Sequence, residues 1–368
     1  MKEKATHWAV TILVALFFAA GLLLCLLRRP QNVSEAERRP LAQRPAFSLQ
    51  GILKGSDAAA FETYAVDQFP LRDAFRSIKA LLSRYVFLRG DNNGFYQVGG
   101  VLVKRDDPLN SASVQSAADK LAAIYDKYLA GGGHRVVYAV VPGKNHYLTP
   151  QSGRPALDDA ALLAILRDTL DGKMTYADLY PLLDAGDYYT TDTHWRQECL
   201  LEPARALAAA LVVTLPDANY VNHSFAEFYG VYHGQSALPT PPETLTWLQS
   251  AATDAAQVHN AETGGTGPVY DQEKLDSADP YELFLSGSQA LLTVENPLNQ
   301  SGRKLLLFRD SFGSSIAPLL LEGYSEITLV DIRYLSSAFL DRFIDFSQGQ
   351  DVLFLYSTLV LNNSAALK

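Results

Sequence analysis

The longest hydrophobic pattern in the chain lies near its N-terminus, where residues 8–27 form a run without a charge. A helix needs about twenty apolar residues to cross the ~30 Å hydrocarbon core of a bilayer. A buried core helix would normally carry a polar stripe, but this run is apolar around its whole circumference. We therefore expect a transmembrane helix through residues 8–27. No segment beyond Pro30 has the length and apolarity of a second span.

A cleaved signal peptide is the closest alternative for this segment. Its apolar core would be shorter and followed by small residues, whereas Arg28–Pro30 follow the run directly, which favours an uncleaved anchor over residues 1–29. A lipoprotein cysteine at Cys25 is disfavoured, because Leu24 precedes it where a small residue is expected. The basic residues on the two sides of the run nearly balance. A short tail, an anchor and a long remainder nevertheless predict a single-pass cell-membrane protein with an extracytoplasmic domain.

After the anchor, a polar stretch is followed by segments in which apolar residues recur at helical spacing. Residues 30–54 begin as a polar, proline-punctuated stretch and are predicted to form a linker. Residues 57–87 show two helical patterns that break at Pro70, and a hairpin-like run follows at 94–103. The apolar residues at near-helical spacing in these patterns are Phe61, Tyr64, Phe69, Phe75, Ile78, Leu81 and Leu82. We expect one catalytic domain over residues 55–368.

From residue 111 onward, helical patterns alternate with short apolar runs. The predicted helices are 111–130, 158–169, 195–212, 314–321 and 337–346, and the predicted strands are 135–141, 304–308, 327–331 and 352–356. Continuous apolar strands separated by helices imply a parallel sheet covered on both faces. The expected fold is therefore an α/β sandwich of three layers. The proline- and glycine-rich residues 235–300 interrupt this rhythm and are predicted to be a loop-rich insertion of loops and short strands.

Composition and charge exclude several classes of protein. With 48% hydrophobic and 19% charged residues, the chain can bury a full-sized core and is neither disordered nor fibrous. A net charge of −9 without clustered Lys and Arg argues against a nucleic-acid partner. Cys199 is the one cysteine outside the anchor, so no intramolecular disulfide with Cys25 is possible, and the fold must rest on its core.

The segment Lys304–Ser315 is the first candidate for chemistry. An apolar strand ends at Asp310, Ser311 falls on the turn, and a helix follows. In open α/β sheets, functional residues lie at this carboxyl end of the strands. The backbone N–H groups at Ser311, Phe312 and Gly313 are candidates to stabilise an oxyanion. Plain N-capping of the helix by the serine is the alternative, and this segment alone does not decide between them.

The segment Tyr188–Trp195 is the second candidate. It places Asp192 and His194 two residues apart at a helix start, so one loop can present a carboxylate and an imidazole together. Serine catalysis needs a base for the hydroxyl proton and a carboxylate that orients the base. An Asp N-cap beside a surface histidine, or half of a metal site, are the alternatives. No further ligands at short spacing accompany the pair, so we expect neither a metal nor a cofactor.

Seven segments of this chain recur in the same order in a known family. They are Glu37–Ser48, Phe61–Asp73, Thr191–Trp195, Asp279–Tyr281, Phe308–Phe312, Val330–Tyr334 and Asp351–Tyr356. On these motifs the sequence resembles the DHHW proteins and the related SGNH-like domains of alginate O-acetylation proteins. Such proteins look like circularly permuted SGNH hydrolases with a flavodoxin-like parallel sheet, in which the Asp-x-His block precedes the Ser block. The order in this chain is the same.

The resemblance implies O-acyl transfer outside the cytoplasm. An acetyl group supplied through a multispanning membrane O-acyltransferase of the MBOAT type is passed to a hydroxyl of an exopolysaccharide or cell-wall glycan. On that basis Ser311 is the nucleophile, His194 the general base and Asp192 the residue that orients it. The chain departs from the family pattern at Gln68, where histidine is expected, and at Arg309, where lysine is commoner. These departures leave the glycan acceptor undefined.

Four further residues follow predicted strand ends and are candidates for substrate contact. They are Lys144, Asn145, Arg333 and Tyr334, and exposed loop positions are the alternative reading for each. A carbohydrate esterase would use the same triad, because the outcome depends on whether water or a sugar hydroxyl reaches the acyl-enzyme. The other alternative is a scaffold in a polysaccharide-modification complex in which the triad is inactive.

Overall fold

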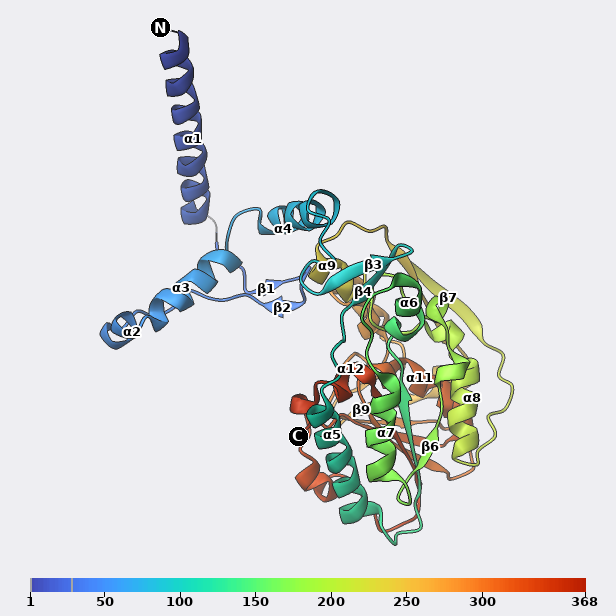
Figure 1. Ribbon diagram of the computed structural model, residues 1–368. Coiled ribbons are helices and arrows are strands. Elements are labelled where there is room, and N and C mark those ends of the chain that lie inside the picture. The colour runs from blue at the N-terminus through green and yellow to red at the C-terminus, as the bar shows by residue number, and fades with distance from the viewer. Residues whose placement is uncertain (1, 28) are drawn as a thin grey trace. The chain divides into compact units, whose positions relative to one another are not determined.

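The computed structural model describes residues 2–27 and 29–368 (Figure 1). Met1 and Arg28, which belong to the predicted anchor, lie outside the described residues. The chain divides into two compact units: Met1–Asn93 with His233–Pro239, and Gly94–Tyr232 with Thr240–Lys368. The sequence predicts a single domain from residue 55, whereas the α/β unit begins at Gly94. The helices over residues 56–86 belong to the first unit because their apolar side chains do not join the α/β core.

The first unit contains the N-terminal helix α1 (Lys2–Leu27), which is long and apolar enough over His7–Cys25 to cross a membrane. Three helices follow: α2 (Leu49–Lys54), α3 (Ser56–Asp67) and α4 (Arg72–Leu81), which continues as one π-helical turn, η1 (Leu82–Val86). The break between α3 and α4 falls at Pro70, as the pattern predicts.

The predicted linker is ordered by polar contacts. It contains the short strands β1 (Val33–Ser34) and β2 (Arg39–Pro40) as well as α2. The Arg39 guanidinium binds the Asp67 carboxylate with nitrogen–oxygen distances of 2.7 and 2.9 Å, and the Ala42 N–H donates to the same carboxylate at 2.9 Å. The pattern of apolar residues contains no information on such polar contacts. The sequence therefore predicts a linker where the structure has short ordered elements.

The second unit is built on an eight-stranded sheet in the order β10-β9-β11-β13-β12-β14-β5-β6. Its strands are β5 (Arg135–Val141), β6 (Thr175–Ala177), β9 (Gln257–Asn260), β10 (Thr266–Gly267), β11 (Leu291–Glu295), β12 (Lys304–Arg309), β13 (Glu326–Val330) and β14 (Asp351–Ser357). The five strands from β13 to β6 are parallel, and β11, β9 and β10 extend the sheet in antiparallel pairs.

The connectivity shows a circular permutation. If the parallel strands are counted from β12 through β14 and then from β5 to β6, their spatial order becomes 2-1-3-4-5. That is the flavodoxin-like order. The three-layer, permuted fold expected from the sequence is confirmed.

Helices cover both faces of the sheet (Figure 1). Residues of α5 (Ser111–Ile124) and α7 (Asp159–Leu170) pack on the face that carries Tyr138, Phe308 and Phe354. Residues of α8 (Leu201–Ala210) and α11 (Phe312–Leu320) pack on the opposite face. The alternation of side chains along each strand therefore supplies two separate hydrophobic cores.

Smaller elements complete the second unit. Strands β3 (Phe95–Val98) and β4 (Val101–Lys104) form the predicted hairpin, and β7 (Val221–Phe228) pairs with β8 (Glu243–Gln249). Helices α6 (Asn145–Ser152), α10 (Ala251–Ala255) and α12 (Thr358–Leu361) are short. Helix α9 (Val231–Ser236) begins in this unit, and its residues from His233 onward are assigned to the first unit. The predicted insertion at 235–300 contains short strands as expected, and three of them, β9, β10 and β11, extend the main sheet.

Candidate active site

Ser311 lies where β12 gives way to α11. The residue before it, Asp310, is buried, and its carboxylate accepts the Phe312 N–H at 3.0 Å and the Ser357 N–H at 2.8 Å. These bonds fix the turn to the end of the neighbouring strand β14. Gly313 is required next, because a Cβ at this position would lie 2.5 Å from the Cβ of Arg309. The turn thus presents Ser311 at the carboxyl end of the parallel strands, where it is half-buried.

Asp192 and His194 occupy one loop that is closed at its base. Tyr188 and Trp195 form an antiparallel bridge, and the Tyr189 N–H donates to the His194 carbonyl at 3.2 Å. The fully buried Asp192 carboxylate accepts the backbone N–H of His194 at 3.0 Å and that of Val231 at 2.7 Å. Two backbone donors therefore hold the carboxylate in place before it meets the imidazole.

The three side chains form one chain of hydrogen bonds. His194 Nδ1 lies 2.6 Å from Asp192 Oδ1, and His194 Nε2 lies 2.8 Å from Ser311 Oγ. The carboxylate holds the proton on Nδ1, so Nε2 is free to accept the serine hydroxyl proton. The predicted loop and the predicted turn, more than a hundred residues apart in sequence, meet within hydrogen-bond distance. This arrangement can generate an alkoxide nucleophile.

Tyr281 packs on the imidazole and was not predicted as a site residue. Its ring lies parallel to that of His194 with a centroid separation of 3.9 Å and an interplanar angle of 7°. Its hydroxyl bonds to Ser315 Oγ at 2.7 Å, and the Trp195 indole N–H donates to the same oxygen at 2.8 Å. Burial raises the pKa of Tyr281 well above its ordinary value, so the phenol stays neutral. The Asp279–Tyr281 motif was the only sequence signal for this residue.

Lys144 is buried beneath the loop that carries Asp192 and His194. Its ammonium donates to the carbonyl of Asp192 at 2.7 Å and to that of Tyr189 at 2.9 Å, and it lies 4.9 Å from the Tyr232 ring centroid. Burial lowers the pKa of Lys144 to about 7, although the nearby Asp192 and Glu243 carboxylates act to raise it. In this position the side chain contacts protein backbone. Its neighbour Asn145 is also buried and donates to the Lys104 carbonyl at 2.5 Å.

Of the other predicted residues, Phe312 packs its ring against that of His194, with a centroid separation of 4.9 Å. Arg333 binds the buried Asp331 carboxylate through Nε and Nη2 at 2.6–3.2 Å, and Tyr334 is 54% exposed. The Phe312 and Gly313 N–H groups, proposed as oxyanion donors, donate to the Asp310 side chain and to the Asp310 carbonyl, respectively. Substrate binding by Arg333 and Tyr334, and stabilisation of an oxyanion by Phe312 and Gly313, stay predictions.

Among residues 2–27 and 29–368, no three His, Cys, Asp or Glu side chains are grouped so that they could hold a metal ion. The candidate site consists of Ser311, His194 and Asp192. Tyr281 stacks on the His194 ring, and Lys144 donates to the backbone of the loop that carries Asp192 and His194.

The DHHW protein family model matches residues 176–330, a region that contains all three residues of the hydrogen-bonded chain. The family resemblance is thereby confirmed. A DHHW family protein from Eubacterium siraeum is 22% identical, covers 75% of this chain and 94% of its own, and aligns with a TM-score of 0.62. Bacillus cereus PatB1, solved with a sulfonyl adduct, is 15% identical over 73% of this chain and 97% of its own, with a TM-score of 0.56.

The O-acetyltransferase domain of Pseudomonas putida AlgJ is 16% identical over 73% of this chain and 92% of its own, with a TM-score of 0.46. No curated protein matches the chain significantly. The first two structures show that this chain shares the permuted SGNH-like fold of proteins whose sequences have diverged widely.

Proposed function

We propose that this protein is a serine-type O-acyltransferase that modifies a polysaccharide of the cell envelope or a secreted polysaccharide. The observation that carries the proposal is the continuous hydrogen-bonded chain from Asp192 through His194 to Ser311. Acetyl as the transferred group, and a glycan as the acceptor, rest on the resemblance to DHHW and alginate O-acetylation proteins.

The proposed reaction has two halves. Ser311 Oγ attacks the carbonyl carbon of the acyl donor while His194 Nε2 takes the hydroxyl proton, and Asp192 stabilises the imidazolium that forms. The donor's leaving group departs with that proton, which leaves an ester on Ser311. A sugar hydroxyl then gives its proton to His194 and attacks the ester carbonyl, which releases the O-acyl glycan and restores the serine hydroxyl.

The proposed location of the reaction rests on the N-terminal helix. We propose that α1 anchors the chain in the cell membrane and that the second unit works outside the cytoplasm, where a multispanning membrane O-acyltransferase supplies the acyl group. The length and apolarity of His7–Cys25 support the anchor. The donor protein is proposed on the resemblance alone.

A labelling experiment tests the nucleophile. A sulfonyl fluoride or fluorophosphonate should add one label to Ser311 in the wild-type protein and none in Ser311→Ala, while Ser314→Ala, a buried serine on the same helix turn, serves as the matched control. The alanine variant should keep the fold, because the side chain at the turn stays small. A label that persists in Ser311→Ala would place the nucleophile elsewhere.

A transfer assay separates acyltransferase from esterase. The protein is incubated with an activated acetyl ester, with and without oligosaccharide acceptors, and acetylated sugar and free acetate are followed separately. Acetylated sugar that requires Ser311 supports the proposed function. Free acetate alone, unchanged by any acceptor, would indicate a carbohydrate esterase that uses the same triad. Glycan acetylation in cells that survives Ser311→Ala would indicate a scaffold.

A further inference from the structure

Helix α4 of the first unit carries an apolar stripe that the protein leaves uncovered. Leu71, Phe75, Ile78, Leu82 and Tyr85 recur at intervals of four and three residues, so they lie on one face of α4 and its π-helical extension. All five are exposed, with Leu71, Ile78 and Tyr85 at 66%, 51% and 65%. A helix that packed on a core would bury such a stripe.

The polar side of the same helix is turned toward the protein. Arg72 and Arg76 both bind the carboxylate of Glu37, at 2.6 and 3.2 Å, and all three side chains are no more than 16% exposed. Arg76 also donates to the Gly234 carbonyl at 2.9 Å, and Lys79 donates to the Asn93 side chain at 2.9 Å. Charged groups thus hold α4 to its own unit, while its apolar stripe faces outward.

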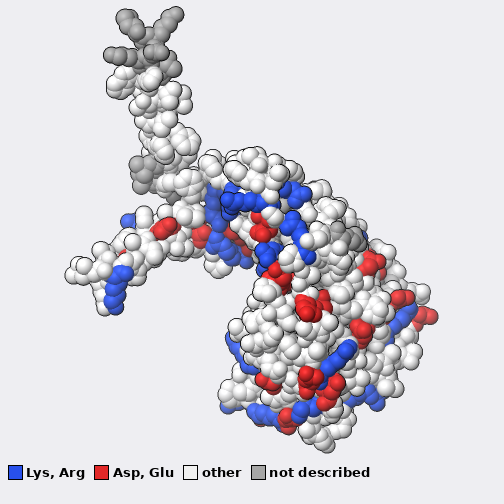
Figure 2. All heavy atoms as spheres, in the orientation of Figure 1, with Lys and Arg blue, Asp and Glu red and all other residues white. Residues whose placement is uncertain are grey.

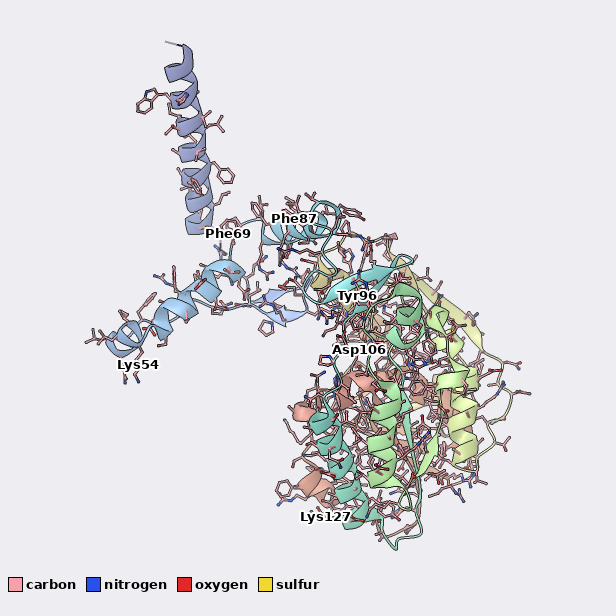
Figure 3. The ribbon with its side chains drawn as sticks, in the orientation of Figure 1. Lys54, Phe69, Phe87, Tyr96, Asp106 and Lys127 are labelled. Atoms are coloured by element: carbon pink, nitrogen blue, oxygen red, sulfur yellow. The ribbon has the colours of Figure 1, made fainter. Side chains whose placement is uncertain are left out.

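The uncovered apolar surface extends over the neighbouring segments of the unit. The exposed large side chains outside the stripe are Phe47, Leu49, Ile52, Leu53, Phe61, Val66, Phe69, Val86, Phe87 and Leu88. Phe69 and Phe87 mark the two ends of the α4 segment (Figure 3). In Figure 2 the top of this segment is white, whereas blue and red atoms lie along its lower edge and on the arm formed by α2 and α3, whose end carries Lys54 (Figure 3). Large apolar side chains exposed together in one segment often mark a site of contact with a protein or a membrane.

Hydrogen bonds between Gln31 and Gln68 hold this surface close to the end of the candidate membrane helix α1. The Gln31 N–H donates to the Gln68 side-chain oxygen at 2.9 Å, and the Gln68 amide returns a hydrogen bond to the Gln31 carbonyl at 2.8 Å. Gln31 is four residues beyond Leu27, the last residue of α1. Four residues span at most about 14 Å, so the junction of α3 and α4 cannot leave the neighbourhood of the bilayer surface if α1 spans it.

The net charge of the segment that follows α1 also differs from that of the whole chain. Residues 29–93 carry ten Lys and Arg and seven Asp and Glu, a net charge of +3, whereas the whole chain carries −9. Basic and apolar side chains together are the composition of segments that lie in the headgroup region of membranes containing anionic lipid.

We propose that α2, α3 and α4 form an interfacial face that inserts its apolar side chains into the bilayer surface beside α1. The proposal rests on the membrane anchor assigned above. The occupant of the face is lipid: the tether places the face at the headgroups, and the net positive charge suits anionic lipid. The anchored chain is then held by two contacts, one that spans the bilayer and one that lies on it.

A fluorescence experiment on the full chain tests this face. In a background of Cys25→Ala and Cys199→Ala, an environment-sensitive fluorophore is attached through Ile78→Cys or, as the matched control, through Asp73→Cys. Both positions are exposed, and Asp73 is on the opposite side of the same helix. The chains are reconstituted in phosphatidylcholine vesicles with and without phosphatidylglycerol, and spin-labelled lipids quench the fluorophore. Unfolding curves by circular dichroism check that both variants are folded.

We expect quenching at position 78 to exceed quenching at position 73 at least about threefold, and to increase with phosphatidylglycerol. Equal, weak quenching at both positions in chains that remain with the vesicles would overturn the interfacial face while leaving the anchor intact. Chains that fail to remain with the vesicles would contradict the anchor itself. Shielding of position 78 in native membranes but not in pure lipid would show that the face binds a protein, which also overturns the proposal.

Discussion

Replacement of Lys144 by methionine is the sharpest test of how the candidate site is held together. Methionine keeps the length and much of the volume of the side chain but removes the ammonium. The carbonyl groups of Asp192 and Tyr189 would lose the donor that lies 2.7 and 2.9 Å from them inside the protein. The loop between Tyr189 and His194 would then be free to move, and Asp192 would move with it.

The magnitude follows from the hydrogen bonds that are lost. A buried carbonyl without a partner costs roughly 1–3 kcal/mol, and removal of a desolvated ammonium offsets part of the loss, so we expect Lys144→Met to lower the free energy of unfolding by about 2–3 kcal/mol. For a unit of this size that corresponds to a fall in Tm of about 4–5 °C. A displacement of the base by ~1 Å would reduce turnover by about a hundredfold.

Thermal unfolding, ester turnover and the rate of Ser311 labelling are measured for Lys144→Met and for Lys104→Met, which removes an exposed lysine of the same unit. The control should match the wild type in all three measurements. A Lys144→Met protein with the wild-type Tm and wild-type turnover would refute the argument. A lower Tm with an unchanged labelling rate would show that Lys144 stabilises the fold without positioning the triad.

The pH dependence of stability gives an independent check of the same ammonium. Burial lowers the pKa of Lys144 to about 7 in the folded protein, whereas an unfolded lysine keeps its ordinary pKa of 10.5. Between these values the unfolded chain binds more protons than the folded chain, so stability from this group rises with pH by at most about 1.4 kcal/mol per unit and is lost as pH falls toward 7. Urea unfolding at pH 7, 8 and 9 should show a shallower rise for Lys144→Met than for Lys104→Met.

Three further predictions concern the surroundings of the triad. Gly230→Ala should lower turnover and Tm, because its Cβ would lie 2.4 Å from the Thr191 carbonyl and 2.5 Å from the Asp192 Cα, whereas Gly267→Ala has open space and should change neither. Asp192→Asn should lower turnover about 10³–10⁴-fold in the ester assay, since the amide no longer holds the working tautomer of His194. It should also lower Tm, because the two carboxylate oxygens accept separate backbone N–H groups, from His194 and Val231, and an amide has only one oxygen to accept them. Burial raises the pKa of Asp106 to about 6, so the folded protein binds more protons between pH 3.8 and 6 and this group's contribution to stability falls as pH rises. Asp106→Asn should therefore stabilise the protein at pH 8 by about 1–2 kcal/mol in urea unfolding and have no such effect at pH 3.5.

The parallel half of the sheet could be predicted because each of its long strands is buried on both faces. Such strands appear as continuous apolar runs, and β5, β12, β13 and β14 lie within a residue of the predicted ranges. The sequence predicts short strands in the insertion but does not give the positions of β9 and β11. They are short, they lie among prolines and glycines, and β9 is exposed at its first residue, so they lack that pattern.

The meeting of Asp192, His194 and Ser311 could also be anticipated, because the carboxyl ends of parallel strands converge on one edge of a sheet. The contacts of Lys144 and Tyr281 could not. Lys144 binds carbonyl oxygens, which every residue possesses and which therefore leave no trace in the sequence. Tyr281 stacks on a ring 87 positions earlier in the chain, and only tertiary structure brings the two together.

The first unit shows what periodicity alone cannot decide. The spacing of Phe75, Ile78 and Leu82 correctly predicts a helix, but a helical stripe specifies only that one face is apolar and not what covers it. The ion pairs of Arg72 and Arg76 with Glu37 decide that question here, because they turn the polar face of α4 inward. The apolar pattern of α4 alone would predict a helix packed on a core, whereas the contacts of Glu37 leave the apolar face of α4 exposed.

The proposed chemistry and the proposed membrane contact are assigned to different units of this protein. Every side chain invoked for acyl transfer belongs to the second unit, and every side chain invoked for membrane contact belongs to the first. Substitutions at Ser311, His194 or Lys144 should therefore abolish or slow reaction with small soluble esters, whereas substitutions at Phe75 and Ile78 should leave that reaction unchanged. If glycan acetylation in cells depends on both sets, the second unit supplies the acyl-enzyme and the first unit brings it to a membrane-bound source of acyl groups. Dependence on the first set alone would mean that α1 is a sufficient attachment.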